Sequence, residues 1–280
     1  MSSNRFEAQT GGYVWIEAEG VKYRIYYETA GSGQPLICVH TSGADSRQWR
    51  HVLNDPKVTD NFRVIAFDLP WHGKSNPPEK WWLTRYALTK DTLVGVIRGV
   101  WEAFDCEQPI VAGCSIGGYV CLQLAYECQD DIRGVIGIEA IAKSPGRYND
   151  FLHHPAIHGS EFVACWTYGL NSPYSDEEAR RENWWYYAQG GPGVYAGNTA
   201  FGREFDMRPH LKDIDTSKCK VSILSGEYDY SATPEMSKAA ADGIKGSRFI
   251  LMKKMGHFPI IEDYPGFQQY FLTELAEMMK

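Results

Sequence analysis

Short runs of β-branched and apolar residues alternate along this chain with longer stretches of helical periodicity. They predict eight strands, at residues 13–18, 22–28, 36–40, 64–68, 110–113, 135–139, 221–225 and 249–253. Several later runs are continuously apolar, as is typical of parallel strands that are covered on both faces. The first two runs flank a tight Glu-Gly turn and indicate an antiparallel hairpin. The pattern therefore predicts an open, mostly parallel sheet with right-handed crossovers.

Helices are predicted between the later strands, at residues 84–104, 116–127, 234–242 and 265–279. The first stretch carries apolar residues close to a helical period. The second is apolar nearly all round, which indicates a buried helix. The last two each have a proline near the first turn, a position that proline favours.

Residues 145–210 interrupt the alternation, because they contain no clear strand and are rich in aromatic residues. An irregular loop of this length is rare in a compact domain. We therefore expect a helical cap over the strand ends. This divides the chain into a first core part at 1–144, a cap at 145–210 and a second core part at 211–280.

Composition excludes several classes of function. The net charge is −7 and no Lys/Arg run exceeds a pair, so a nucleic-acid partner is not expected. No run of about 18 apolar residues predicts a membrane span, and residues 1–7 lack the apolar core of a signal peptide. The odd number of cysteines, seven, without CxxC spacing, predicts free thiols in a reducing cytoplasm. The Cys and His residues also lack the spacing of a zinc site.

The segment Gly-Cys-Ser-Ile-Gly at residues 113–117 lies between a predicted strand and a predicted helix. This is the G-x-S-x-G pattern in the strand–turn–helix context that exposes a nucleophilic serine, Ser115. The residues two before and two after the serine must lack side chains, because the strand and helix would otherwise collide. The alternative is a turn of small residues that only packs a helix on a strand.

Acyl transfer also needs hydrogen-bond donors directed at the oxygen that becomes negative. We predict the backbone N–H of Ile116, directly after the serine, as one donor. The second is expected from the loop after the strand at 36–40, and we assign it to the N–H of Ser42.

A serine hydroxyl needs a base to take its proton. His257 follows the last predicted strand and so lies at the carboxyl edge of the sheet, where open α/β sheets bind ligands. His40 ends a strand and His72 lies in a turn, so both are less well placed. The sequence predicts His257 as the base.

An acid must fix the tautomer of that imidazole. Asp229 follows the strand at 221–225, which gives the chain order Ser, Asp, His. Glu139 ends the strand at 135–139 and is the alternative acid.

Together these residues resemble the α/β-hydrolase superfamily, in its serine esterase and lactonase branch with an inserted cap. The resemblance spans nearly the whole chain. It includes the opening hairpin, the loop at His40, the turn Asp-Leu-Pro-Trp-His-Gly-Lys-Ser at 68–75, the 113–117 segment and the loops of Asp229 and His257. It implies an eight-stranded sheet with an antiparallel second strand, and a cap inserted after strand six.

Two local features stand apart from the usual pattern. The family's usual His-Gly at the oxyanion loop is here His40-Thr41. Glu139 is similar in position to the acid of lactonases that open the zearalenone macrocycle, which keeps it as an alternative to Asp229.

These observations predict a cytoplasmic serine hydrolase that cleaves a carboxylic ester or lactone of an apolar or aromatic small molecule through an acyl-enzyme on Ser115. Trp184 and Tyr187 are the predicted substrate-lining residues. No metal or organic cofactor is expected, and a homodimer is left open. The same scaffold also serves carbon–carbon hydrolases of aromatic ring-cleavage products, cofactor-free haloperoxidases, lyases and ligand receptors, which remain alternatives.

Overall fold

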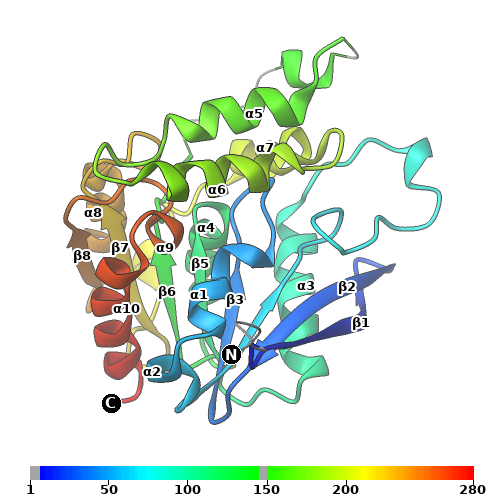
Figure 1. Ribbon diagram of the computed structural model, residues 1–280. Helices are drawn as coiled ribbons and strands as arrows, with labels where there is room; N and C mark the ends of the chain where they lie inside the picture. The colour runs from blue at the N-terminus through cyan, green and yellow to red at the C-terminus, as the bar shows by residue number, and fades with distance from the viewer. Residues whose placement is uncertain (1–6, 145–149, 155) are drawn as a thin grey trace, which may run out of the picture.

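The computed structural model describes residues 7–144, 150–154 and 156–280. The predicted strands form one eight-stranded sheet with the order β1-β2-β4-β3-β5-β6-β7-β8 (Figure 1). The strands are β1 (Thr10–Ala18), β2 (Val21–Ala30), β3 (Gln34–Val39), β4 (Phe62–Phe67), β5 (Ile110–Cys114), β6 (Gly134–Ile138), β7 (Lys220–Gly226) and β8 (Arg248–Met252).

The pairing confirms a mostly parallel sheet. β2 runs antiparallel to both of its neighbours, β1 and β4. All the remaining pairs, from β4 through to β8, are parallel. The carboxyl ends of β3, β5, β6, β7 and β8 therefore meet at one edge of the sheet, which is where the loops of the predicted site begin.

Helices cover both faces of the sheet. One face is covered by α3 (Lys90–Ala103), α4 (Ile116–Glu127) and α8 (Pro234–Asp242), and the other by α1 (Arg50–Leu53), α2 (Pro56–Thr59) and α10 (Tyr264–Met278). In β3, Ile37 and Val39 pack on the first group, whereas Leu36 and Cys38 pack on the second. Burial on both faces explains why this strand is continuously apolar. Within the described residues, no helix is both long and apolar enough to cross a bilayer.

A helical insertion follows β6. It contains α5 (Gly159–Tyr168), α6 (Glu177–Ala188) and α7 (Val194–Glu204), which lie across one end of the sheet in Figure 1. Buried residues of these helices form a third apolar cluster with Phe258 and Ile261, which lie at the short helix α9 (Pro259–Glu262). The expected cap boundary at residue 145 and the first six residues lie outside the described residues.

The helix predicted from residue 84 begins only at Lys90. The Thr89 side chain accepts the N–H of Thr92 at 3.0 Å, which caps the helix at this point. Upstream, the Leu88 N–H donates to the carbonyl of Gly197 in α7 at 3.0 Å. The prediction was wrong here because a capping threonine and contacts with the insertion outweigh the apolar periodicity.

Candidate active site

Ser115 lies between β5 and α4, at the carboxyl edge of the sheet. Its φ of 56° belongs to a region that non-glycine residues rarely adopt. Its N–H donates to the carbonyl of Ile138 at 2.9 Å, which holds the turn. A Cβ on Gly113 would lie 2.3 Å from Gly117 O, and a Cβ on Gly117 would lie 2.5 Å from Val39 O. The predicted need for glycine on both sides of the serine therefore has a direct steric cause.

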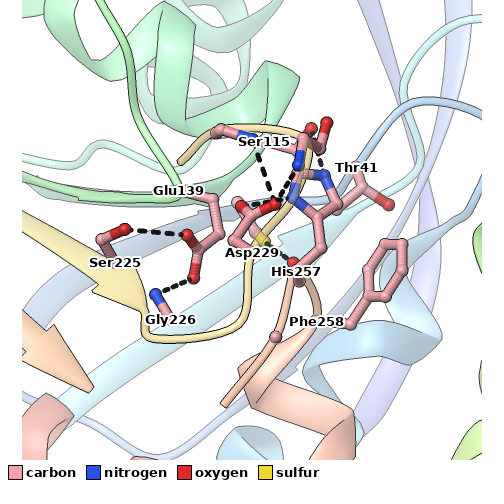
Figure 2. Close-up of polar contacts among 12 residues, drawn as sticks. Thr41, Ser115, Glu139, Ser225, Gly226, Asp229, His257 and Phe258 are labelled. Carbon is pink, nitrogen blue, oxygen red and sulfur yellow. Dashed lines mark hydrogen bonds and ion pairs between the residues drawn. The ribbon is translucent and has the colours of Figure 1, made fainter. Parts of the chain in front are cut away.

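Three polar side chains from different loops form a hydrogen-bonded chain at this edge (Figure 2). His257, in the loop after β8, places Nε2 at 2.9 Å from Ser115 Oγ and Nδ1 at 2.7 Å from Asp229 Oδ2. A carboxylate can only accept hydrogen bonds, so Nδ1 carries the proton and Nε2 presents its lone pair to the hydroxyl. An imidazole in this tautomer can take the proton of the serine when it attacks a carbonyl.

Asp229 is buried yet favoured as a carboxylate. Its Oδ1 accepts the N–H groups of Ser231 at 2.6 Å and Ala232 at 3.0 Å. Burial opposes ionisation, but the His257 imidazole and these hydrogen bonds together hold the pKa of Asp229 below its ordinary value. A stable negative charge thus faces the Nδ1 side of the imidazole.

Glu139 occupies a different position from Asp229. In Figure 2 Asp229 lies between Glu139 and His257. The Glu139 carboxyl is fully buried, accepts the N–H of Gly226 at 2.8 Å and hydrogen-bonds with Asp229. The imidazole therefore contacts Asp229 directly, and Glu139 reaches it through Asp229.

The loop that carries His257 is held by Glu262, which the sequence analysis did not single out. This buried carboxyl accepts the N–H groups of Gly256 at 2.7 Å and Phe258 at 2.8 Å, on either side of His257. It also accepts the N–H of Ser172, between α5 and α6, at 3.0 Å. The one available signal was an acidic residue at the end of the apolar run after His257.

Both predicted oxyanion donors, Ser42 and Ile116, line the same cavity as the nucleophile. The loop of Ser42 is fixed by its neighbour Thr41, whose N–H and hydroxyl donate to Gln48 Oε1 at 2.9 and 3.0 Å. The Thr41 hydroxyl also lies 2.6 Å from the Tyr187 hydroxyl of α6. The departure from the usual His-Gly thus adds a polar link between this loop and the insertion, which a glycine could not make.

The cavity beside the nucleophile has a volume of about 60 Å³. Its wall combines aromatic rings with hydroxyl groups. They belong to Tyr119, Tyr187, Tyr195 and Phe258, and to Ser42, Ser144, Thr167, Thr199 and Ser231. Among the described residues, no Asp, Glu, Lys or Arg lines it. Apart from His257, the described side chains of this wall therefore carry no charge.

Comparison with known proteins places the chain in a family. A model of the alpha/beta hydrolase family matches residues 36–267. The chain belongs to the alpha/beta hydrolase family. Its structure is similar to that of a thermophilic esterase from Thermogutta terrifontis, with a TM-score of 0.84 and 21% identity over 96% of this chain and 100% of that one. It is also similar to the enol-lactonase from Burkholderia xenovorans LB400, with a TM-score of 0.79 and 19% identity over 95% and 99% of the two chains.

In sequence, this hydrolase is 23% identical to the 2-hydroxy-6-oxononadienedioate/2-hydroxy-6-oxononatrienedioate hydrolase of Escherichia coli O139:H28. The match covers 96% of this chain and 97% of that protein. The structural likenesses, at their low identities, establish the fold.

Of the two predicted lining residues, Tyr187 borders the cavity of the hydrolase and Trp184 does not. Trp184 packs against the third apolar cluster instead. It precedes Tyr187 by three residues in α6, which moves its side chain about 4.5 Å along the helix axis. Trp185 is 54% exposed and Tyr186 is buried. The four consecutive aromatic residues therefore divide among the cavity, the core and the solvent.

A second polar link joins the hydrolase core to the insertion. Asn198 in α7 lies 2.7 Å from His72 Nε2 and accepts the Tyr86 hydroxyl at 2.9 Å. His72 Nδ1 lies 2.8 Å from the carbonyl of Pro70, so Nδ1 donates and Nε2 accepts. Burial, reinforced by the nearby His40, lowers the pKa of His72 to about 3. This histidine is therefore a neutral structural element that holds α7, whose residues line the cavity.

Proposed function

We propose that this protein hydrolyses carboxylic esters or lactones with a small, uncharged acyl group, through an acyl-enzyme on Ser115. The observation that carries the proposal is the hydrogen-bonded chain from Asp229 through His257 to Ser115 at the wall of a cavity. Serine, imidazole and carboxylate in this order are the elements of acyl transfer in hydrolases.

The proposed reaction has two stages. Ser115 Oγ attacks the carbonyl carbon while its proton passes to His257 Nε2, and the carbonyl oxygen becomes negative. The N–H groups of Ser42 and Ile116 are the proposed donors to that oxygen. The imidazolium then gives its proton to the leaving alkoxide as the carbon–oxygen bond breaks. Water, deprotonated by the same imidazole, attacks the acyl carbon, and the imidazolium returns this proton to Ser115 Oγ as the acyl–oxygen bond breaks and the acid is released.

The size of the cavity supports a small acyl group. Its volume is about 60 Å³, whereas an apolar protein cavity that holds benzene measures roughly 150 Å³. We assign this cavity to the acyl group, so an aromatic ring on the acyl side would not fit beside Ser115 without displacement of the wall. With this assignment, the aromatic group of an aromatic substrate belongs to the alcohol.

The likeness to the Escherichia coli hydrolase favours a second candidate, hydrolysis of a carbon–carbon bond in a ring-cleavage product. The named substrates of that enzyme are dioates, which carry two carboxylates. Among the described residues, no Lys or Arg lines the cavity. A second carboxylate buried there would lack a partner, which is strongly unfavourable. The ester or lactone is therefore the first candidate.

The proposal is tested with a fluorophosphonate probe and a set of substrates. The set contains 4-nitrophenyl esters of acetate, butyrate, octanoate and benzoate, a simple lactone, and a ring-cleavage dienedioate followed by its absorbance. Each is assayed with the wild type, Ser115→Ala and Asp229→Asn. We expect the probe to label the wild type and not Ser115→Ala. We expect kcat/KM to be highest for acetate or butyrate and at least about tenfold lower for octanoate and benzoate.

Ser115→Ala should lower kcat by about 10⁴-fold or more, and Asp229→Asn by a similar factor. Wild-type turnover by Ser115→Ala on every ester would refute the nucleophile. Preference for benzoate would refute the small acyl group and leave the nucleophile intact. Faster turnover of the dienedioate than of any ester would support the second candidate instead.

A further inference from the structure

We infer that Glu139 is a positioning residue, a neutral carboxylic acid that donates a hydrogen bond to Asp229 and holds its carboxylate against His257. Its effect on turnover rests on the proposed function, whereas its protonation and its contact with Asp229 do not.

The backbone at Glu139 is strained in a way that directs this side chain inward. Glu139 follows β6 with a φ of 52°, in the left-handed region that costs a non-glycine residue energy. Its N–H donates to the carbonyl of Leu224 in β7 at 2.8 Å, which fixes that geometry. Strain of this kind is retained where surrounding structure imposes it, and it concentrates at functional sites.

The carboxyl group of Glu139 is enclosed and contacts a second acid. Its exposure is 0%. One oxygen accepts the N–H of Gly226 at 2.8 Å and the other lies 3.4 Å from Ser225 Oγ (Figure 2). The group also hydrogen-bonds with Asp229. Two carboxylates cannot hydrogen-bond with each other, since both only accept. One of the two acids must therefore carry a proton.

The surroundings assign that proton to Glu139. Asp229 receives two backbone N–H groups and the imidazole, whereas Glu139 receives one close N–H. Glu262 and the buried thiol of Cys114 also act on Glu139, and neither supplies a positive charge. Burial, and next the negative charge of Asp229, raise the pKa of Glu139 well above its ordinary value.

The consequence for the site is a fourth hydrogen bond to Asp229 that adds no charge. A neutral donor fixes the carboxylate that holds the imidazole tautomer. A second carboxylate at this place would instead repel it and add a negative charge near the imidazole. The two acids that the sequence offers as alternatives thus act together, one ionised and one neutral.

Two variants test whether the hydrogen bond from Glu139 to Asp229 supports turnover. Glu139→Gln keeps the shape, the neutral state, a donor and an acceptor, whereas Glu139→Met keeps similar bulk and removes both. With an ester substrate we expect Glu139→Met to lower kcat about tenfold with little change in KM, as for loss of one hydrogen bond to a charged group. Glu139→Gln should lose clearly less, so that the conservative variant rescues the function.

Two further readouts need no substrate. At about pH 8, where ordinary carboxyl groups are ionised, the infrared spectrum of the wild type should contain a neutral carboxylic acid band that Glu139→Gln lacks. The matched control is Glu274→Gln, because Glu274 is also buried but pairs with Arg248 at 2.8 Å, and the band should persist there. By NMR, the titration midpoint of the His257 ring should move by less than about 0.3 pH units in Glu139→Gln.

Loss of a negative charge would instead lower that midpoint by about one unit or more. Such a shift, or an infrared spectrum unchanged by Glu139→Gln, would overturn the neutral acid. Equal kcat in the wild type, Glu139→Gln and Glu139→Met would overturn the positioning role. If no ester is turned over, the infrared and NMR results still decide the state of Glu139, so failure of the proposed function remains distinguishable.

Discussion

Replacement of His72 by Gln tests whether the buried histidines beneath the insertion make folding sensitive to acid. Burial, with His40 nearby, lowers the pKa of His72 from 6.5 to about 3. Between these values the unfolded chain binds a proton that the folded protein does not. The free energy of unfolding is therefore complete above pH 6.5 and is lost as the pH falls from 6.5 towards 3.

The size of this effect follows from the linkage relation. At about pH 5, His72 alone should remove about 2 kcal/mol of unfolding free energy relative to neutral pH. His40, whose pKa burial lowers to about 4, should remove a similar amount. Asp68 acts in the opposite direction, because burial and the charge of Asp45 raise its pKa to about 6. It restores about 1 kcal/mol over the same interval, so these three groups together remove about 3 kcal/mol. A neutral Glu139, as inferred above, acts in the same direction as Asp68.

The assay is urea unfolding followed by tryptophan fluorescence, at about pH 7.5 and about pH 5. The quantity compared is the change in unfolding free energy between the two pH values, so a general loss of stability in a variant cancels. We expect this change to be about 2 kcal/mol smaller in His72→Gln than in the wild type. His158→Gln is the matched control, because the His158 side chain is 70% exposed, and should behave as the wild type. Identical pH dependence in all three proteins would refute the reasoning.

Three other substitutions, with Gly20→Ala as a control for one of them, test the residues that support the site. Glu262→Ala leaves buried N–H groups on both sides of the catalytic loop without an acceptor, so we expect a loss of about 3 kcal/mol in urea unfolding and at least about a tenfold fall in kcat; wild-type stability would contradict the structural role. Gly117→Ala places a methyl group 2.5 Å from a backbone carbonyl oxygen and should cost about 3 kcal/mol or more. Gly20→Ala, at a φ of 73° with nothing within 4 Å, should cost only about 1 kcal/mol, and equal losses would argue against the steric account. Tyr187→Phe removes the hydroxyl bonded to Thr41 and should raise KM several-fold while the unfolding free energy falls by about 1 kcal/mol; unchanged kinetics would show that this link does not shape the cavity.

The strands could be predicted because a strand that is buried on both faces is apolar at successive positions. In β5, Val111 packs in the cluster on one face, whereas Ile110 and Ala112 pack in the cluster on the other. Every position must then be apolar, and the run stands out without any knowledge of its neighbours. The start of α3 could not be predicted in this way, because local periodicity does not show long-range contacts. Leu88 fits the helical period, yet its N–H bonds to Gly197, more than a hundred residues later.

The residues of the hydrogen-bonded chain could be predicted from the sequence for a topological reason. Ser115, Asp229 and His257 each follow a parallel strand, and parallel strands bring their carboxyl ends to one edge. The residues that hold these loops follow no such rule. Glu262 and Gln48 act by accepting backbone N–H groups, and any polar residue within reach could do so. Their identity depends on loop conformations that short sequence patterns do not encode.

The sequence alone does not decide whether Asp229 or Glu139 contacts the imidazole. Both follow neighbouring central strands, β7 and β6, so topology brings both to the imidazole without ranking them. The ranking depends on one backbone angle, the φ of 52° at Glu139, and on the donors around each carboxyl group. Asp229 receives the backbone N–H groups that favour charge, and Glu139 is left in an environment that favours a proton. Because burial makes two adjacent charges untenable, the same physics that excludes Glu139 as a second anion makes it suitable as a donor to the first.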